Sequence, residues 1–240
     1  MSEAREAPRR SSFPAAVAGG LIGAALTAAI LVFAVPELVA GRLVRAGMMS
    51  DPQILVDAGE ALRDRQYAPI LAQHRASIET PFGTSWKGAS KPDVVLVEFY
   101  DYACPYCKAS NPALDRLIKE DPGLRVVFRE LPILGPDSVA AARLSLAASK
   151  AGRFAQFHDA LWAAGKPGPQ TIAQASAAAG IAPNAAANAE IEAELRKNFQ
   201  LAGALGARGT PLFVVGDRVL DSAVGYDKLK EAIADAREKG

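Results

Sequence analysis

Apolar residues are distributed in two contrasting ways along the chain. Residues 14–35 form an apolar run without a charged side chain, about as long as the roughly 20 residues of a bilayer-spanning helix. From residue 51 to residue 79, apolar positions instead recur at helical spacing. The remainder alternates short apolar runs, typical of buried strands, with longer amphipathic stretches, typical of helices. The pattern predicts a membrane-proximal segment, then a helical segment, then a mixed α/β domain.

Within the domain, the predicted order of elements is β-α-β, a long helical section, and β-β-α. The first strand is an apolar run that continues to Tyr100 and is broken only by Glu98, and a turn at Gly216-Asp217 joins the last two strands. The predicted elements are strands at 94–100, 124–129, 211–215 and 219–220, a helix at 108–120, a helical section at about 136–205, and a closing helix at 226–237.

The N-terminal segment predicts export. Residues 1–12 carry three arginines, and basic residues prefer the cytoplasmic side, so we expect 1–12 in the cytoplasm and 13–36 as a transmembrane signal anchor. Two arginines just beyond the span, at 42 and 45, weaken the prediction of that orientation. The alternative is a secretory signal cleaved near residues 32–34, although its apolar region would be shorter, roughly 7–15 residues. In both cases the remaining chain lies in the bacterial periplasm, where disulfides persist.

Residues 37–79 are predicted to form a helical stalk, and residues 80–92, rich in turn-forming residues, a linker. Ser50-Asp51-Pro52 is a favourable helix start, with a capping side chain followed by proline. The apolar face of the stalk has two interpretations. It packs on the domain behind it, or it associates with other copies to form a homo-oligomer.

Overall composition excludes some functions. The 240-residue chain has a formal net charge of +1, which does not indicate a nucleic-acid partner. Two cysteines and two histidines leave few metal ligands. A structural zinc site needs about four ligands, and only His74 and His158 could complete one with the cysteines, so we expect no metal centre of that kind.

The two cysteines, Cys104 and Cys107, lie three positions apart. A disulfide between them would close almost no loop and add little stability, so the pair indicates chemistry rather than architecture. It falls between the first predicted strand and the first predicted helix, the arrangement of thioredoxin-like redox sites. We therefore interpret residues 93–240 as a thioredoxin fold with an inserted helical subdomain.

The surrounding residues suit thiol chemistry. The thiolate is the reactive species, and Cys104 falls at a predicted helix N-terminus, where the helix dipole stabilises an anion. Glu98 follows four hydrophobic residues and precedes Phe99, so we expect it to be at least partly buried. Burial would raise its pKa and suit it to exchange protons with Cys107. The alternative is a solvated strand-end carboxylate, because buried carboxylates are rare.

Three features together resemble one family. They are residues 98–107, from Glu98 to Cys107, the helical insertion, and residues 209–214 around Thr210-Pro211. They resemble the DsbA family of extracytoplasmic thiol-disulfide oxidoreductases, and within it the suppressor-of-copper-sensitivity C type. The likeness covers about residues 93–239, and more loosely 51–79. It implies a cofactor-free oxidase or isomerase acting on cysteines of exported proteins, with a membrane redox partner.

The resemblance also implies roles for residues. Thr210-Pro211 matches the family's cis-proline loop, which would face Cys104 and pair its backbone with an extended substrate; an ordinary trans proline is the alternative. The implied residues are catalytic Cys104, Cys107 and Glu98, and substrate-binding Pro105, Tyr106, Thr210 and Pro211.

Two departures leave the direction of electron flow open. Strongly oxidising members carry Pro-His between the cysteines, where the histidine helps to hold the thiolate, and this chain has Pro105-Tyr106. Threonine before the proline resembles isomerases and copper-associated members. Copper binding is therefore an alternative function, since two thiolates can hold Cu(I).

An aromatic face in the insertion has two interpretations. Phe154, Phe157, His158 and Trp162 share one helical face. Packing of the subdomain is the preferred interpretation, and peptide binding is the alternative.

Overall fold

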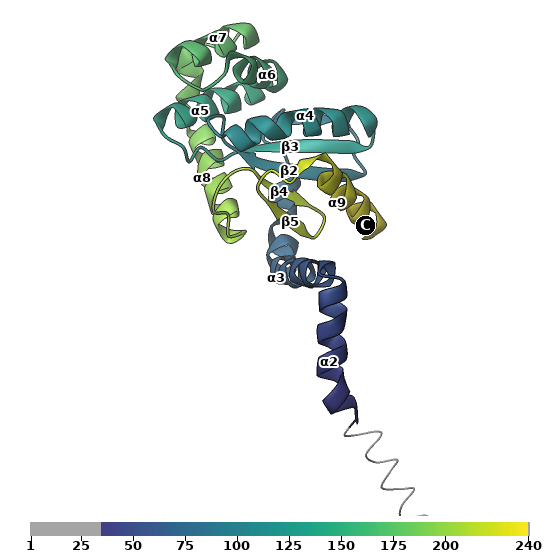
Figure 1. Cartoon of the computed structure of the whole chain (residues 1–240). Helices are drawn as coiled ribbons and strands as arrows, with labels where there is room; N and C mark the ends of the chain where they lie inside the picture. The colour runs from purple at the N-terminus through teal and green to yellow at the C-terminus, as the bar shows by residue number, and fades with distance from the viewer. Residues whose placement is uncertain (1–34, 240) are drawn as a thin grey trace, which may run out of the picture. The chain divides into compact units, whose positions relative to one another are not determined.

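The computed structural model describes residues 35–239 of the chain (Figure 1). The predicted cytoplasmic segment 1–12 and nearly all of the predicted anchor 13–36 lie outside these residues. Among the described helices, none combines the length and the hydrophobicity needed to cross a membrane. The chain divides between Ala61 and Leu62 into two compact units.

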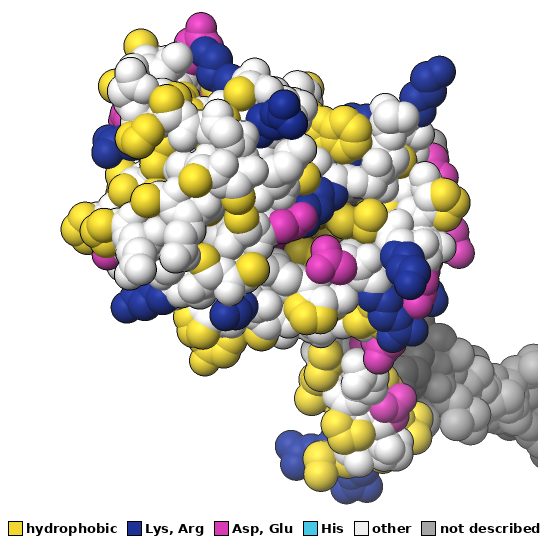
Figure 2. All heavy atoms as spheres, turned by 90° about the horizontal axis from the view of Figure 1, so that it is seen from above, with side chains coloured by type: hydrophobic (Ala, Val, Ile, Leu, Met, Phe, Trp, Pro, Cys, Tyr) yellow, Lys and Arg dark blue, Asp and Glu magenta, His cyan; other side chains and the backbone are white. Residues whose placement is uncertain are grey.

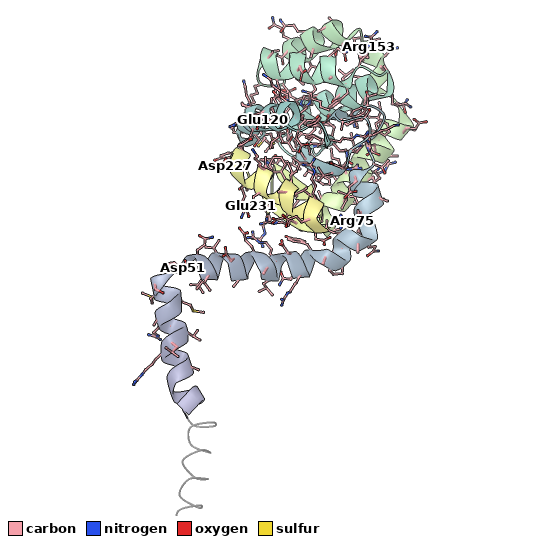
Figure 3. The ribbon with its side chains drawn as sticks, turned by 90° about the vertical axis from the view of Figure 1, so that its right-hand side faces the viewer. Asp51, Arg75, Glu120, Arg153, Asp227 and Glu231 are labelled. Carbon is pink, nitrogen blue, oxygen red and sulfur yellow. The ribbon has the colours of Figure 1, made fainter. Side chains whose placement is uncertain are left out.

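The first unit is helical. It contains α2, Val35–Ser50, and the beginning of α3, Gln53–Glu79. Asp51 lies between the two helices (Figure 3), and its carboxylate accepts a hydrogen bond of 3.1 Å from the backbone N–H of Gln53. The capping side chain at the predicted start of the helix is therefore Asp51. Several large apolar side chains of the two helices are exposed: Leu43, Val44, Met48, Met49, Ile54, Leu55 and Val56.

The second unit begins with the rest of α3, which packs against the domain. Leu71 and Ile78 are each only 1% exposed and belong to the same cluster as Val97 and Phe99. Arg75 donates a 3.0 Å hydrogen bond to the carbonyl oxygen of Gly216 (Figure 3). The second half of the predicted stalk therefore packs on the domain, as one of the two interpretations expected.

A five-stranded mixed sheet has the order β1-β3-β2-β4-β5. The central strand β2 runs parallel to β3 and antiparallel to β4. The helix α4, Pro105–Glu120, connects β2 to β3, because parallel neighbours need a crossover. The strands are β1, Trp86–Gly88; β2, Val94–Tyr100; β3, Leu124–Glu130; β4, Leu212–Val215; and β5, Arg218–Asp221.

The segment predicted as a linker, residues 80–92, contains β1. This three-residue strand pairs with β3 in antiparallel fashion, with Trp86 opposite Val127. Its last residue, Gly88, pairs with Arg125. A strand this short has too little periodicity to be distinguished from a linker in the sequence.

Alternate side chains of β2 enter two different cores, as the pleat of a strand requires. Leu96 and Tyr100 pack with α4, with the closing helix α9, Gly225–Lys239, and with the insertion. Val97 and Phe99 pack on the opposite side with α3 and α8. Each fully buried apolar side chain of this kind contributes about 1.5–3 kcal/mol. Glu98 lies on the same face as Leu96 and Tyr100, toward α4.

The helical insertion forms one end of the domain (Figure 1). Its helices carry Phe154, Phe157, His158 and Trp162, all of them buried, and the Phe and Trp side chains belong to the cluster that includes Leu114 of α4. The preferred packing interpretation of this aromatic face agrees with the structure. The insertion comprises α5, Pro136–Lys150; α6, Phe154–Ala164; α7, Pro169–Ala179; a 3-10 turn, Pro183–Ala186; and α8, Ala189–Ala204.

Helices α4 and α9 lie side by side on one face of the sheet. Figure 3 shows Glu120, at the end of α4, close to Asp227 at the beginning of α9. The hydroxyl of Tyr226 donates a hydrogen bond to the Glu120 carboxylate. This contact joins the two helices at the end of α4 opposite to the cysteines.

Candidate active site

The turn before α4 is shaped by Asp101. Its carboxylate accepts hydrogen bonds from the backbone N–H groups of Ala103 at 2.7 Å, Ile133 at 2.8 Å and Leu134 at 2.9 Å. Asp101 is 1% exposed. Its two oxygen atoms therefore tie the segment that leads to Cys104 to the loop after β3. Sequence reasoning did not single out this residue, although aspartate is a common residue in such turns.

Cys104 is the N-cap of α4, and Pro105 is the first residue of the helix. Proline suits this position because its missing N–H would have no partner in the helix anyway. The Cys104 side chain makes no capping hydrogen bond. The N–H of Cys104 itself donates a 3.0 Å hydrogen bond to the carbonyl oxygen of Asp101, so the N–H groups that the first turn leaves unpaired begin after Pro105.

The proline loop meets the first cysteine. The thiol of Cys104 donates a hydrogen bond of 3.1 Å to the carbonyl oxygen of Thr210. The peptide bond between Thr210 and Pro211 is cis, as the resemblance implied. Both cysteines are free thiols, and Cys104 is 4% exposed whereas Cys107 is fully buried. A partner that reaches the site thus meets Cys104 first.

Glu98 lies in the middle of the sheet, between Phe128 of β3 and Phe213 of β4. It is 1% exposed, and its Oε1 atom has no hydrogen-bond partner. Burial raises its pKa well above the usual value, and the charges of Cys104 and Glu130 add to the effect. The burial expected from the sequence is present. Glu98 therefore keeps its proton to a higher pH than an exposed glutamate does.

Cys107 and Glu98 influence each other. Burial raises the pKa of the Cys107 thiol, and the charge of Glu98 raises it further. Hydrogen bonding to the backbone of Asp101 and, less strongly, to the Thr210 side chain lowers the pKa of this thiol. The two groups thus compete for ionisation, and a proton is held near the second sulfur.

A buried polar network, which sequence reasoning missed, adjoins the site. Tyr100 donates a hydrogen bond to the carboxylate of Glu130, and its hydroxyl lies 3.0 Å from that of Tyr102. The Tyr102 hydroxyl lies 3.1 Å from Nδ1 of His158. Because Trp162 donates to Nε2 of His158 at 3.1 Å, the proton of the neutral imidazole belongs on Nδ1. The network connects β2 and β3 to the insertion.

The buried network holds its groups neutral. Burial raises the pKa of Glu130 to about 8, although hydrogen bonds from Ser145 and Tyr100 oppose the effect. Burial also lowers the pKa of His158 well below its usual value. His158 is therefore a neutral packing residue with satisfied ring nitrogens.

The structure brings most of the predicted residues together. Thr210 touches Cys104, and Glu98 acts on Cys107 through its charge. Tyr106, in contrast, is 65% exposed and extends into solvent. Among the described residues, no group of three or more histidine, cysteine or acidic side chains could hold a metal ion.

A model of the DSBA-like thioredoxin domain family matches residues 95–234. Among curated proteins, the Na(+)/H(+) antiporter NhaA 3 of Salinispora tropica is 35% identical over 79 residues. The match covers 32% of this chain and only 12% of the antiporter. The shared segment is too small a part of that protein for its transport activity to be assigned to this chain.

Solved structures agree with the family match. A thioredoxin-like oxidoreductase from Silicibacter pomeroyi is 34% identical, with a TM-score of 0.65, covering 68% of this chain and 98% of that one. ScsC of Proteus mirabilis, in a transitional conformation, is 29% identical with a TM-score of 0.66, covering 86% and 99%. The thiol-disulfide exchange protein α-DsbA2 of Wolbachia pipientis is 26% identical with a TM-score of 0.65, covering 72% and 97%.

Proposed function

Because this chain belongs to the family of DSBA-like thioredoxin domains and is a protein-disulfide oxidoreductase of that family, we propose that it exchanges disulfides with cysteines of exported proteins through Cys104 and Cys107. The observation that carries the proposal is the arrangement of the two sulfurs. Cys104 lies at the N-cap of α4 against the Thr210 carbonyl, whereas Cys107 is fully buried. The nucleophile is Cys104, and the resolving thiol is Cys107.

The exchange proceeds in two balanced steps. In the oxidising direction, a substrate thiolate attacks the sulfur of Cys104, a new disulfide forms, and Cys107 leaves with the bonding electrons. A second substrate thiolate then attacks the substrate sulfur of the mixed disulfide and releases Cys104. Two electrons pass from the substrate to the protein. In the reverse direction, reduced Cys104 attacks a substrate disulfide, and Cys107 releases it.

Glu98 supplies the proton that Cys107 needs. A buried thiolate without a partner is costly, and the raised pKa of the Cys107 thiol reflects that cost. Burial likewise raises the pKa of Glu98, and its Oε1 atom has no hydrogen-bond partner. Protonating Cys107 as it leaves, and deprotonating it as it attacks, is the role that fits this carboxyl.

The substrate lies along the Thr210-Pro211 loop. Proline has no N–H, so Pro211 adds no donor beside the sulfur, while the backbone of Thr210 pairs with an extended substrate strand. Pro105 and the exposed Tyr106 contact the substrate on the other side of Cys104. The contacts are therefore mainly with the substrate backbone, which allows many sequences.

We place the domain in the periplasm, carried by the predicted anchor at residues 13–36, where a membrane redox partner reoxidises or reduces Cys104 and Cys107. The exposed apolar side chains of α2 and early α3 form the contact between copies in a homo-oligomer. Removal of the stalk must stop at Ala61, because Leu71 and Ile78 belong to the core of the domain. Light scattering on the exported protein and on a variant that begins at Leu62 tests the assembly.

The test of the exchange chemistry is catalysed reduction of insulin. Cys104→Ser removes the nucleophile and should abolish catalysis. Cys107→Ser keeps the first step but not release, so it should accumulate mixed disulfides with substrates. Retained activity in Cys104→Ser would overturn the mechanism.

A second assay tests the direction of electron flow. An oxidase should form disulfides in reduced ribonuclease, whereas an isomerase should restore activity to scrambled ribonuclease. An isomerase is expected to be the oligomer in light scattering, and to lose this activity when residues before Leu62 are removed.

A further inference from the structure

The surface beside Cys104 is hollowed on the side of the helical insertion. The hollow has a volume of about 310 Å³ and lies between the start of α4 and the loop after α6. Tyr102 and Trp162 form apolar parts of its wall, and Cys104 itself lines it. Lys108 of α4 and Lys166 of the loop approach it from different elements. We refer to this site as the lysine hollow.

The charge of the lysine hollow is not balanced. Neither an aspartate nor a glutamate lines it, and within residues 35–239 neither Lys108 nor Lys166 forms an ion pair. A neighbouring hollow between α4 and α6 differs, because there Lys87 pairs with Asp159 and lies 4.0 Å from Asp115. Figure 2 shows acidic and basic side chains gathered around a hollow on that side. Two unpaired cations beside a reactive sulfur are therefore a specific property of the lysine hollow.

We propose that the lysine hollow binds an acidic side chain of the substrate, so that the enzyme prefers cysteines with an aspartate or glutamate close by. The inference rests on the proposed exchange at Cys104. A carboxylate in the hollow would meet two ammonium groups against an aromatic wall that excludes part of the water. Such a pair is stronger than one in full solvent.

The position of the acidic residue follows from the expected path of the substrate. In an extended peptide along Thr210, side chains two positions apart point to the same side. When the substrate cysteine faces Cys104, the residue two positions away also faces the protein, about 6.6 Å further along the chain. We expect that residue to meet the lysine hollow on one side of the cysteine, because Cys104 itself lines the hollow. On the other side it meets a separate hollow lined by Arg208, Thr210 and Asp221, in which a cation is accompanied by an acid.

The experiment uses the full-length oxidised protein and short peptides with two cysteines. The peptides differ only in having glutamate, glutamine or lysine two residues before, or two residues after, the first cysteine. The quantity compared is kcat/KM for catalysed peptide oxidation, divided by the rate at which oxidised glutathione alone oxidises the same peptide. This division is necessary because a neighbouring lysine or glutamate also alters the reactivity of the peptide thiol.

For one of the two placements, we expect the normalised kcat/KM of the glutamate peptide to exceed that of the lysine peptide by about fivefold. This ratio corresponds to one favourable surface ion pair. The preference should decline as salt is raised from low to high concentration. Equal rates for glutamate, glutamine and lysine peptides at both placements would overturn the inference while leaving exchange at Cys104 intact. If no peptide is oxidised at all, the proposed exchange itself fails.

Variants assign the preference to the lysine hollow. Lys166→Gln is the more informative single change, because Lys166 lies outside the helix that carries Cys104. The double variant Lys108→Gln/Lys166→Gln should reduce the ratio of glutamate to lysine peptide rates to near one. Lys119→Gln, in the last turn of α4, is the matched control and should keep the ratio. If the double variant keeps the wild-type ratio of glutamate to lysine peptide rates, the lysine hollow is not the source of the selectivity and the inference fails.

Discussion

The thiol of Cys104 lies 3.1 Å from the carbonyl oxygen of Thr210, although 106 positions separate the two residues. They meet because β2, which leads to the cysteines, pairs with β4, which follows the proline loop. The register of that pairing, with Phe99 opposite Leu212, decides which backbone atoms face the sulfur. The sheet thus determines which residues surround Cys104. The first turn of α4 determines where Cys107 lies relative to Cys104.

The first prediction concerns Glu98. Glu98→Gln removes the proton acceptor for Cys107 without changing the size of a buried side chain. Release of substrate from the Cys104 mixed disulfide should slow about 10- to 100-fold, at or below the low end of what general acid–base catalysis supplies. The rise of that release rate with pH, caused by ionisation of the carboxyl, should also disappear. Rapid acid quenching of the mixed disulfide at several pH values measures both effects.

The matched control for Glu98 is Glu120→Gln, a glutamate exposed at the far end of α4. It should leave the release rate and its pH dependence unchanged. If Glu98→Gln releases substrate at the wild-type rate with the wild-type pH profile, then water or another group carries the proton.

The second prediction concerns stability and pH. Burial raises the pKa of Glu130 to about 8, whereas a glutamate in the unfolded chain titrates near 4.3. The native state therefore binds this proton more tightly, so the stabilisation is complete below about pH 4 and is lost as pH rises through about 8. The free energy of unfolding should fall across this range, by at most about 1.4 kcal/mol per pH unit for one carboxyl.

The variant Glu130→Gln tests this assignment, because an amide oxygen can still accept the hydrogen bond from Tyr100. Its free energy of unfolding, measured with urea between about pH 5 and 8, should depend less on pH than that of the wild type. Glu98 contributes in the same direction, so some slope should remain. An exposed control, Glu190→Gln, should keep the full slope. An identical slope in Glu130→Gln would show that this carboxyl is ionised in the native state.

Parts of the site that depend on local sequence could be predicted. The apolar run before Cys104 indicates a buried strand, the following residues indicate a helix, and the single polar position within the strand marks Glu98. These inferences need only the periodicity of one element. The roles assigned to the cysteines remain predictions.

Parts that depend on tertiary contacts could not be predicted. Glu130 meets Tyr100 because β2 and β3 are in parallel register, with these two residues opposite each other. Lys166 reaches the neighbourhood of Cys104 only through the packing of α6 against the sheet. Nothing in the spacing of these residues indicates their proximity, and a strand as short as β1 carries almost no pattern of its own.

The third prediction concerns Tyr106. Its exposed side chain can be changed without disturbing the core. Tyr106→His should favour the reduced form, because an imidazolium next to Cys104 stabilises the thiolate. A tenfold change in the redox equilibrium corresponds to about 30 mV. We expect the reduction potential to shift by that order toward a more oxidising value, measured by equilibration with glutathione.

The control Tyr106→Phe should leave the potential near that of the wild type. Equal potentials for the wild type and both variants would show that a histidine at this position does not determine the reduction potential.

The fourth prediction concerns Arg129, the largest side chain in the fully buried set. Its guanidinium donates to the carboxylate of Glu194 at 2.9 Å, to Asn198 at 2.8 Å and to the carbonyl oxygen of Ile78 at 2.7 Å. It thereby ties β3 to α8 and to the end of α3. Arg129→Met leaves a buried carboxylate and several carbonyl groups without this partner, so we expect a loss of about 3–5 kcal/mol in the free energy of unfolding.

The matched control for Arg129 is Arg143→Met, which breaks an exposed pair with Glu192 and should cost at most about 1 kcal/mol. Urea unfolding at one pH measures both variants. The double variant Arg129→Met/Glu194→Leu should recover part of the loss, because it removes the buried carboxylate that Arg129→Met leaves with Lys197 as its remaining ion-pair partner. A small effect of Arg129→Met, equal to that of Arg143→Met, would mean that water reaches this site and replaces the guanidinium. The second half of α3 would then be attached to the domain by its apolar contacts and by Arg75.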